Sequence, residues 1–276
     1  MKLLRVGEAG HEVPAMLDAD GQMRSLAGVT GDFGGAGVSL AALDALRGIN
    51  LATLPVITGR VGCPLSHVPN FLCVGLNYAR HAAEAGMAIP AEPILFNKTA
   101  SALSGPFDPV ILPPGHSKVD WEVELGIVIG RETYQVSEAD ALTHVAAYVT
   151  VNDVSERAWQ IERGGQWTKG KSAPTFGPVG PWLVTADEVP DPQALGISLA
   201  LNGVTVQDSS TSDMIFGVAH IISYMSRFMR LLPGDLIATG TPEGVGMGAK
   251  PQRFLRAGDV MTLEVAGLGR QRLDVI

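Results

Sequence analysis

Residues Asp120–Gly130 read DWEVELGIVIG, and this stretch decides the fold. Acidic and apolar residues alternate as far as Leu125, and the rest of the stretch is continuously apolar. Alternation is typical of a strand, because successive side chains point to opposite faces. A continuous apolar run is typical of a strand that is buried on both faces. We therefore predict a strand that runs through the core and carries acidic side chains near its beginning.

The alternation places Asp120, Glu122 and Glu124 on one face of that strand. Neighbouring acids on this face lie roughly 6.6 Å apart, which is twice the rise per residue. At an effective dielectric constant of about 20, each ionised pair costs about 2.5 kcal/mol. A solvated acidic face is the alternative. If the strand is buried instead, the acids need either raised pKa values or a cation.

A further carboxylate follows a second predicted strand. The stretch AAYVTVNDVSERAWQ, residues 146–160, reads as a strand that ends at Asn152–Asp153, with Ser155 as the cap of the next helix. Glu122, Glu124 and Asp153 together form an all-oxygen set, which favours a hard cation such as Mg²⁺, Mn²⁺ or Ca²⁺. Three protein ligands leave coordination positions for water and substrate, as a catalytic metal requires.

A candidate general base lies in GLNYARHAAEAG, residues 75–86. We expect a short helix that Asn77 caps and Gly86 ends. His81 and Glu84 are three residues apart, so they share one face of that helix. A carboxylate on one ring nitrogen fixes the histidine tautomer and raises its basicity, which suits the activation of water. An ordinary surface pair, or two further metal ligands, are the alternatives.

Composition limits the classes of protein and partner. The 276 residues are 46% hydrophobic and 17% charged, which predicts a folded chain with a sizeable core. The net charge of −8 disfavours nucleic acids and anionic membranes as partners. No apolar run is long enough for a membrane span, and the start lacks the apolar stretch of a secretion signal. With Cys63 and Cys73 as reduced thiols, we expect a cytoplasmic protein.

The pattern of strands and helices predicts the α+β class with two domains, a small N-terminal α+β domain (residues 1–69) and a larger domain (residues 70–276). The first contains short strands in KLLRVG and PAMLDA and a helix from Ser39 to Gly48. The second contains a hairpin around Asn202–Gly203 and another in residues 259–276. We also predict a helix that opens at Ser137 with Asp140 as capping partner, and one over residues 213–231.

The stretch GQWTKGKS, residues 165–172, has the spacing of a nucleotide-binding P-loop. Such a loop follows a strand and opens a helix. Here a short amphipathic helix is predicted upstream, and three prolines prevent a helix downstream. Nucleotide binding is therefore disfavoured; it would predict ATP affinity that survives the loss of Glu122 and Glu124. A non-catalytic protein that binds a fully coordinated Ca²⁺ is a further alternative.

Together these motifs resemble the fumarylacetoacetate hydrolase family from about Phe71 to the C-terminus. The resemblance rests on several motifs in the family's order: GLNYARHAAE, FNKTASAL, DWEVELGIVIG, NDVSERAWQ, QWTKGKS and GDLIATGTPEGVG. It implies a mixed β-sandwich roll, a Mg²⁺ or Mn²⁺ site, a small variable N-terminal region and usually a homodimer.

The resemblance also implies residue roles. Glu122, Glu124 and Asp153 match the metal ligands, and His81 with Glu84 matches a water-activating dyad on a mobile lid. Lys171 matches a cationic residue that stabilises a developing enolate. The positions implied to contact substrate are Arg157, Gln160, Thr241, which would touch its carboxylate, and Lys98.

The implied substrate is a 2-oxo acid. For a 2,4-dioxo acid (an acylpyruvate or a 2,4-diketo-3-deoxy sugar acid), hydrolysis of a carbon–carbon bond would release pyruvate and a carboxylic acid. The motifs look most like a bacterial branch that acts on L-fuconate or L-rhamnonate derivatives and is often labelled ureidoglycolate lyase. Decarboxylation of oxaloacetate-like acids and isomerisation of dienoates are alternatives on the same site. The dyad favours hydrolysis, because decarboxylation needs no activated water.

Overall fold

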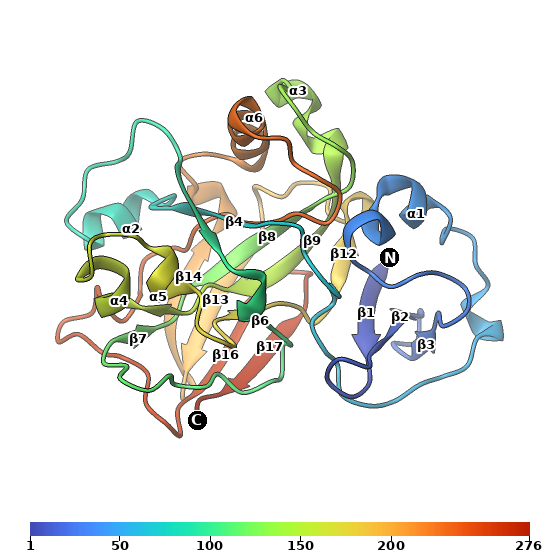
Figure 1. Cartoon of the computed structure of the whole chain (residues 1–276), viewed down its shortest axis with the longest axis horizontal. Coiled ribbons are helices and arrows are strands. Elements are labelled where there is room, and N and C mark those ends of the chain that lie inside the picture. The colour runs from blue at the N-terminus through green and yellow to red at the C-terminus, as the bar shows by residue number, and fades with distance from the viewer.

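A computed structural model describes all 276 residues of the chain (Figure 1). Strand β8 (Val123–Ile129) runs through the middle of a nine-stranded sheet, and every one of its residues is buried. It pairs antiparallel with β9 (Val145–Asn152) on one side and with β15 (Leu236–Ala238) on the other. The prediction of a strand buried on both faces is confirmed, and the fold is a sheet-rich member of the α+β class.

The large sheet has the order β3-β2-β1-β12-β9-β8-β15-β4-β5, and only β15 and β4 pair in parallel. Its other strands are β1 (Lys2–Val6), β2 (Val13–Leu17), β3 (Met23–Ser25), β4 (Phe71–Gly75), β5 (Ile94–Lys98) and β12 (Leu183–Thr185). Two short pairs lie outside it: β6 (Leu103–Ser104) with β11 (Gly177–Pro178), and β7 (Val119–Asp120) with β10 (Ser155–Glu156).

A second, four-stranded antiparallel sheet has the order β14-β13-β16-β17 and contains both predicted hairpins. Its strands are β13 (Gly196–Leu201), β14 (Val204–Ser210), β16 (Val260–Val265) and β17 (Arg270–Asp274). Asn202 and Gly203 have φ angles of 53° and 79°, the left-handed pair that a tight hairpin turn requires. Strands β13 and β16 pack against β8, and the apolar side chains between them form the largest core cluster.

The first 69 residues add strands to the large sheet. Strand β1 pairs with β12, so β1, β2 and β3 form one end of that sheet. In Figure 1 they lie at the right, far from helices α2, α4 and α5 at the left. Leu3 and Phe33 share a core cluster with Val149 of β9. The domain boundary after residue 69 stays a prediction.

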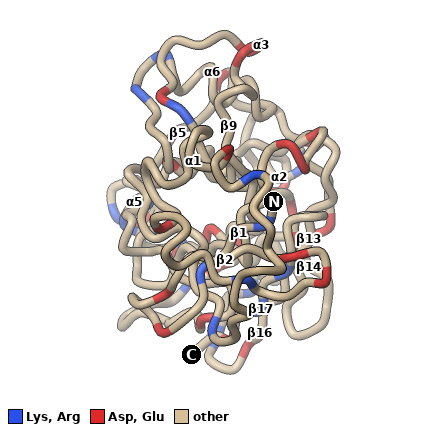
Figure 2. The backbone as a smooth tube through the Cα atoms, turned by 90° about the vertical axis from the view of Figure 1, so that its right-hand side faces the viewer, with Lys and Arg blue, Asp and Glu red and all other residues tan.

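The helices are short: α1 (Leu40–Asp44), α2 (Ala79–Glu84), α3 (Glu138–Ala141), α4 (Arg157–Ile161), α5 (Thr168–Lys171) and α6 (Val218–Phe228). None of them is both long and apolar enough to cross a lipid bilayer. The predicted caps at Ser39 and Ser137 are confirmed, since each hydroxyl accepts a hydrogen bond from a backbone N–H of the first turn. Acidic and basic residues are interspersed over the whole molecule (Figure 2).

The limits of four predicted helices are wrong. Helix α1 ends at Asp44, before the predicted stop at Gly48, because residues 45–48 form turns. Helix α6 is shorter than residues 213–231, because Phe216 is tied to the side chain of Asn77 and Met229 is extended. Asn77 therefore does not cap α2; its amide nitrogen donates to the carbonyls of Phe216 and Thr239. Ser155 does not cap α4, because its hydroxyl donates to Glu122. Glu156 is the cap and accepts from the N–H of Trp159 at 2.6 Å.

Candidate metal and active site

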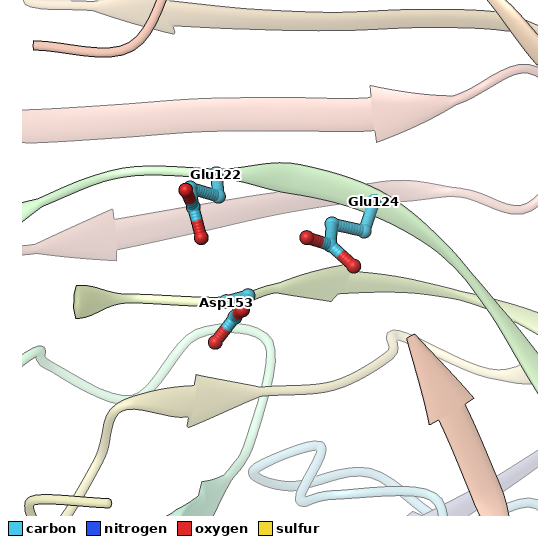
Figure 3. Close-up of side chains that lie close together, drawn as sticks. All are labelled: Glu122, Glu124 and Asp153. Atoms are coloured by element: carbon cyan, nitrogen blue, oxygen red, sulfur yellow. The ribbon is translucent and has the colours of Figure 1, made fainter. Parts of the chain in front are cut away.

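Three buried carboxylates meet where β8 begins and β9 ends. Glu124 lies in β8 and Glu122 directly precedes it, while Asp153 directly follows β9. The backbone N–H of Asp153 donates to the carbonyl of Glu122 at 2.9 Å, which holds the two segments side by side. One oxygen from each carboxylate lies within 4.8 Å of the others. Figure 3 shows the three side chains converging from the two neighbouring segments.

Asp120 does not share that face, and the prediction that it does is wrong. The strand is interrupted after Asp120, so β7 and β8 are separate elements. The Asp120 carboxylate accepts from the N–H groups of Gly246 (2.6 Å) and Met247 (3.0 Å) and from Arg157 Nε (2.9 Å). Asp120 therefore anchors the glycine-rich loop of residues 240–248 and the arginine, away from the acid trio.

Two of the three acids are paired with buried cations. Lys171 Nζ contacts Glu122 and lies 2.6 Å from Asp153 Oδ2. The second oxygen of Asp153 accepts from Lys98 Nζ at 2.5 Å. The second oxygen of Glu122 accepts from Arg157 Nη2 at 2.6 Å. Glu124 has no ion-pair partner, and its Oε2 accepts only from the N–H of Gly240 at 2.8 Å.

The pKa values follow these partners. Burial raises the pKa of the Glu122 carboxyl, but the charges of Arg157 and Lys171 lower it further, to well below its usual range. Burial raises the pKa of Glu124 well above its usual range, and the charges of Asp153 and Glu122 add to the rise. Glu124 is thus the acid whose negative charge the protein does not compensate.

The residues present fit a hard divalent cation. The trio is all oxygen, which suits Mg²⁺, Mn²⁺ or Ca²⁺ better than a softer metal. The trio and the nearby Asp120 make four buried carboxylates. Only three buried cations lie among them, namely Lys98, Arg157 and Lys171. With Glu124 ionised, the cluster would carry one excess negative charge, and burial without that missing countercharge raises the pKa of Glu124. A divalent ion would reverse this excess to one positive charge, which a substrate carboxylate could then neutralise.

The predicted His–Glu pair forms beside the trio. Helix α2 carries both residues, and His81 Nδ1 lies 3.4 Å from Glu84 Oε2, a long contact. Glu84 also accepts from the N–H of Gly244 at 3.1 Å, which fixes the carboxylate in place. Gly86 ends the helix with a φ of +68°, as predicted. With Nδ1 turned to Glu84, Nε2 of the nearly buried imidazole is left for a proton from water.

One cavity of about 560 Å³ brings most of the predicted site residues together. Its lining includes His81, Glu84, Glu122, Glu124, Asp153, Arg157, Gln160, Lys171 and Thr241. Lys98 does not line it; this lysine is fully enclosed behind Asp153. Arg157 donates to Gln160 at 3.1 Å, and the Thr241 hydroxyl donates to the carbonyl of Val123 at 2.9 Å.

Sequence reasoning missed the part played by the loop of residues 240–248. Its backbone N–H groups bind three carboxylates, those of Glu124, Glu84 and Asp120. Gly240 has a φ of +99°, and a Cβ there would lie 2.7 Å from the Cβ of Asn77, so only glycine fits. The repeated glycines of TGTPEGVGMG are the signal that could have indicated backbone donors at this place.

The stretch GQWTKGKS does not build a phosphate loop. No strand precedes it, and α5 is a single turn that ends at Lys171. The ammonium of Lys171 is directed at the carboxylates of Glu122 and Asp153. The lysine is therefore part of the acid cluster.

Comparisons with known proteins point to one family. The family model for the fumarylacetoacetate (FAA) hydrolase C-terminal region matches residues 70–276. A Burkholderia lata protein that carries a provisional hydrolase name is 55% identical over 274 residues, covering 98% of this chain and 97% of the relative.

Two solved structures extend this likeness to the fold. A fumarylacetoacetate hydrolase from psychrophilic Exiguobacterium antarcticum is 34% identical with a TM-score of 0.88, covering 100% of this chain and 99% of that one. A 2-hydroxyhepta-2,4-diene-1,7-dioate isomerase from Mycobacterium marinum is 34% identical with a TM-score of 0.75. The match covers 100% of this chain and 98% of that one. The likeness thus includes a hydrolase and an isomerase.

Proposed function

The chain belongs to the fumarylacetoacetate hydrolase family of enzymes, and on this premise we propose that it hydrolyses a carbon–carbon bond of a 2,4-dioxo acid. The products would be pyruvate and a carboxylic acid. One observation carries the proposal: a candidate cation site, a His–Glu pair and a buried lysine all line the same cavity. A purely structural cation site has no use for a base beside it.

His81 would act as the general base. With its Nδ1–H held by Glu84, Nε2 takes a proton from water while the oxygen adds to the acyl carbonyl at C4. The bond between C3 and C4 then breaks, and its electron pair passes to the pyruvate fragment as an enolate. Return of the proton from His81 to C3 completes pyruvate, so that one water molecule has been added across the broken bond. Decarboxylation would need no activated water, which is why the pair favours hydrolysis over it.

Lys171 would stabilise the enolate charge as it develops. Burial lowers the pKa of its ammonium, but the charges of Asp153 and Glu122 raise it further, so the side chain is positively charged at neutral pH. A fixed positive charge in a buried position is among the strongest means of lowering such a barrier.

Mg²⁺, or Mn²⁺ or Ca²⁺ in its place, would be held by Glu122, Glu124 and Asp153. When bound, it would supply a Lewis acid for the oxygens of the 2-oxo acid. Arg157 and Gln160 would orient the substrate, and Thr241 would contact its carboxylate. Lys98, enclosed behind Asp153, would act as the countercharge of that ligand. We further propose the sandwich roll, the homodimer and the cytoplasmic location that the family resemblance implies.

The change His81→Ala tests this function. We expect kcat for an acylpyruvate with Mg²⁺ to fall by about 10² to 10⁴, the usual contribution of a general base. The affinity for Mg²⁺, measured by calorimetry, should not change, which separates a base from a metal ligand. His220 also pairs with a glutamate, Glu138 at 2.9 Å, outside the cavity, so His220→Ala is the matched control. Unchanged hydrolysis by the His81 variant would rule out this base.

A further inference from the structure

The cavity that holds the acid trio has apolar walls. Its larger apolar lining side chains are Leu76, Met87, Phe96, Ile161, Trp167 and Met247. They come from six separate places in the chain, so the fold gathers them around one space. A substrate held at the cation site of the trio would place the rest of its length against these walls.

Two of these side chains, Phe96 and Trp167, are held in place by packing. The rings of Phe96 and Trp167 meet edge to face, with centroids 5.2 Å apart and an angle of 63°. A Cβ at Gly75 would overlap the Trp167 ring, so glycine provides the space in which the indole lies. Lys171 Nζ lies 4.9 Å from the centroid of Phe96, which places this aromatic wall directly beside the reacting end of the cavity.

Two other apolar side chains of the lining, Met87 and Ile161, are exposed to solvent. Met87, which follows helix α2, is 51% exposed, and Ile161, the last residue of α4, is 48% exposed. Both line the cavity. A ligand that covered them would remove apolar surface from water, which favours binding in proportion to the area covered.

At the open part of the cavity, the polar side chains of the lining are few beside the apolar ones and are partly engaged. Gln160 Oε1 accepts from Arg157, and Gln252 Nε2 donates to the carbonyl of Met247 at 2.8 Å, while Lys250 also lines the cavity. Thr241 bonds to Val123 and Gln207. Along the apolar side chains Met87, Ile161, Phe96 and Trp167, a chain of hydroxyl groups would leave water without gaining equivalent partners, and such a loss weakens binding.

We infer, resting on the proposed function, that the acyl group of the 2,4-dioxo acid is apolar, an alkyl, alkenyl or aryl chain. The polyhydroxylated chains of sugar-derived acids, which the sequence motifs suggested, do not match these walls. Ile161 and Met87 are the specificity-determining side chains at the open part of the cavity, and Trp167 with Phe96 forms the fixed part.

A substrate series tests this inference. The full chain with Mg²⁺ is assayed on acylpyruvates with straight acyl chains of two to six carbons, and on polyhydroxylated acyl chains of the same lengths. We expect kcat/KM to rise about fourfold per added methylene until the walls are covered. Each hydroxylated compound should be at least about tenfold poorer than its alkyl counterpart. A flat series, or better turnover of the hydroxylated compounds, would overturn the inference.

A variant at Ile161 separates the effect of the apolar lining on substrate preference from any effect on the reaction itself. Ile161→Thr should lower kcat/KM for the six-carbon acyl chain by about three- to tenfold and leave the two-carbon compound within about twofold. Val204, 63% exposed at the start of β14 and not part of the cavity lining, gives the matched control Val204→Thr, which should change neither. An equal loss on both substrates in the Ile161 variant would mean a merely structural role and would contradict the inference.

Binding without turnover separates this inference from the proposed function. Simple 2-oxo acids, from pyruvate to 2-oxooctanoate, lack the second carbonyl and cannot be cleaved in this way. Their affinities with Mg²⁺, measured by calorimetry, should rise with tail length if the walls accept apolar chains. If no acylpyruvate is hydrolysed, the proposed function fails. The binding series still shows whether the cavity accepts apolar chains, and affinities that do not rise with tail length would overturn the inference.

Discussion

At the scale of single residues, Lys171 shows how surroundings decide the role of a side chain. In the sequence it is the lysine of a GKS triplet, which is typical of a phosphate loop. In the structure it is buried and contacts Glu122 and Asp153. The types and spacing of Glu122, Glu124 and Asp153 could indicate a shared site, because two successive predicted strands carry them and all three are oxygen ligands.

The cations around the trio could not be predicted in the same way. Lys98 is 55 residues away from its partner Asp153, and Asp120 is 37 residues away from Arg157. Such pairs depend on the tertiary fold and leave no local pattern. Only the family resemblance pointed to these side chains, and it indicated contacts with substrate, whereas the structure shows them bound to carboxylates.

The change Lys171→Met tests the electrostatic role of this lysine. We expect kcat for an acylpyruvate to fall by about 10² to 10³, the loss typical of a removed oxyanion partner. Mg²⁺ affinity should hold or increase, because one positive charge beside the trio is gone. Lys169→Met is the control, since that exposed side chain of the same helix bonds only to a backbone carbonyl. A kcat within about threefold of the unchanged protein would contradict the role.

At the scale of elements, local turn chemistry was predictable and helix length was not. The Asn202–Gly203 hairpin needs only its own two residues to specify the turn, and it forms as predicted. Helix α6 is cut short because Asn77, more than a hundred residues earlier, binds the backbone at Phe216. Distant contacts of this kind override the helical periodicity that the sequence shows.

Glu156 holds the start of α4, the helix that carries Arg157 and Gln160. Its carboxylate accepts from the N–H groups of Trp159 (2.6 Å), Lys118 (2.7 Å) and Ser117 (3.0 Å). Burial raises its pKa, but these hydrogen bonds lower it further, to below its ordinary value of 4.5. The stabilisation is therefore complete above about pH 4.5 and is lost as the pH falls through the lowered pKa.

Because the pKa of Glu156 is lowered in the folded protein, we predict that the effect of Glu156→Gln on stability depends on pH. The variant should lose about 1–3 kcal/mol of unfolding free energy at pH 7, because an amide cannot accept on both sides. The difference should shrink as the pH falls through the lowered pKa of Glu156, because the carboxylate of the unchanged protein is then protonated. Denaturant unfolding at several pH values measures it. The exposed Glu162→Gln is the control, and a loss that stays equal from pH 7 down through that pKa would refute the account.

Arg80 fastens helix α2 over the cavity. Its guanidinium contacts Asp213, lies 2.9 Å from Glu243 and donates to Ser209 at 3.1 Å. We predict that Arg80→Met speeds backbone hydrogen exchange in residues 79–86 and lowers kcat/KM about tenfold, because His81 is then less well positioned. Stability should change by less than about 1 kcal/mol, as for other exposed ion pairs.

The control for this helix is Arg230→Met, which removes a similarly exposed pair with Glu132 elsewhere on the surface. It should leave both exchange in α2 and activity unchanged. Unaltered exchange in the Arg80 variant would show that the contacts do not hold the helix.

At the scale of the whole molecule, the site exists only in the folded chain. Its parts come from α2, the β8 and β9 ends, α5 and the loop of residues 240–248, and the sheet brings them together. An ion bound by the trio would therefore stabilise the entire fold, since the unfolded chain has no such site. Glu124, a buried carboxyl whose ionised form no protein cation compensates, is the feature on which the proposed cation site depends.

Calorimetric titration of Mg²⁺ into the unchanged protein and into Glu124→Gln tests that feature most directly. Glutamine has the shape of the neutral carboxyl that burial favours at this position, so the variant should fold normally. The account predicts one Mg²⁺ bound per chain in the unchanged protein and none, or an affinity at least about a hundredfold weaker, in the variant. Equal binding by both proteins, or no binding by either, would contradict it.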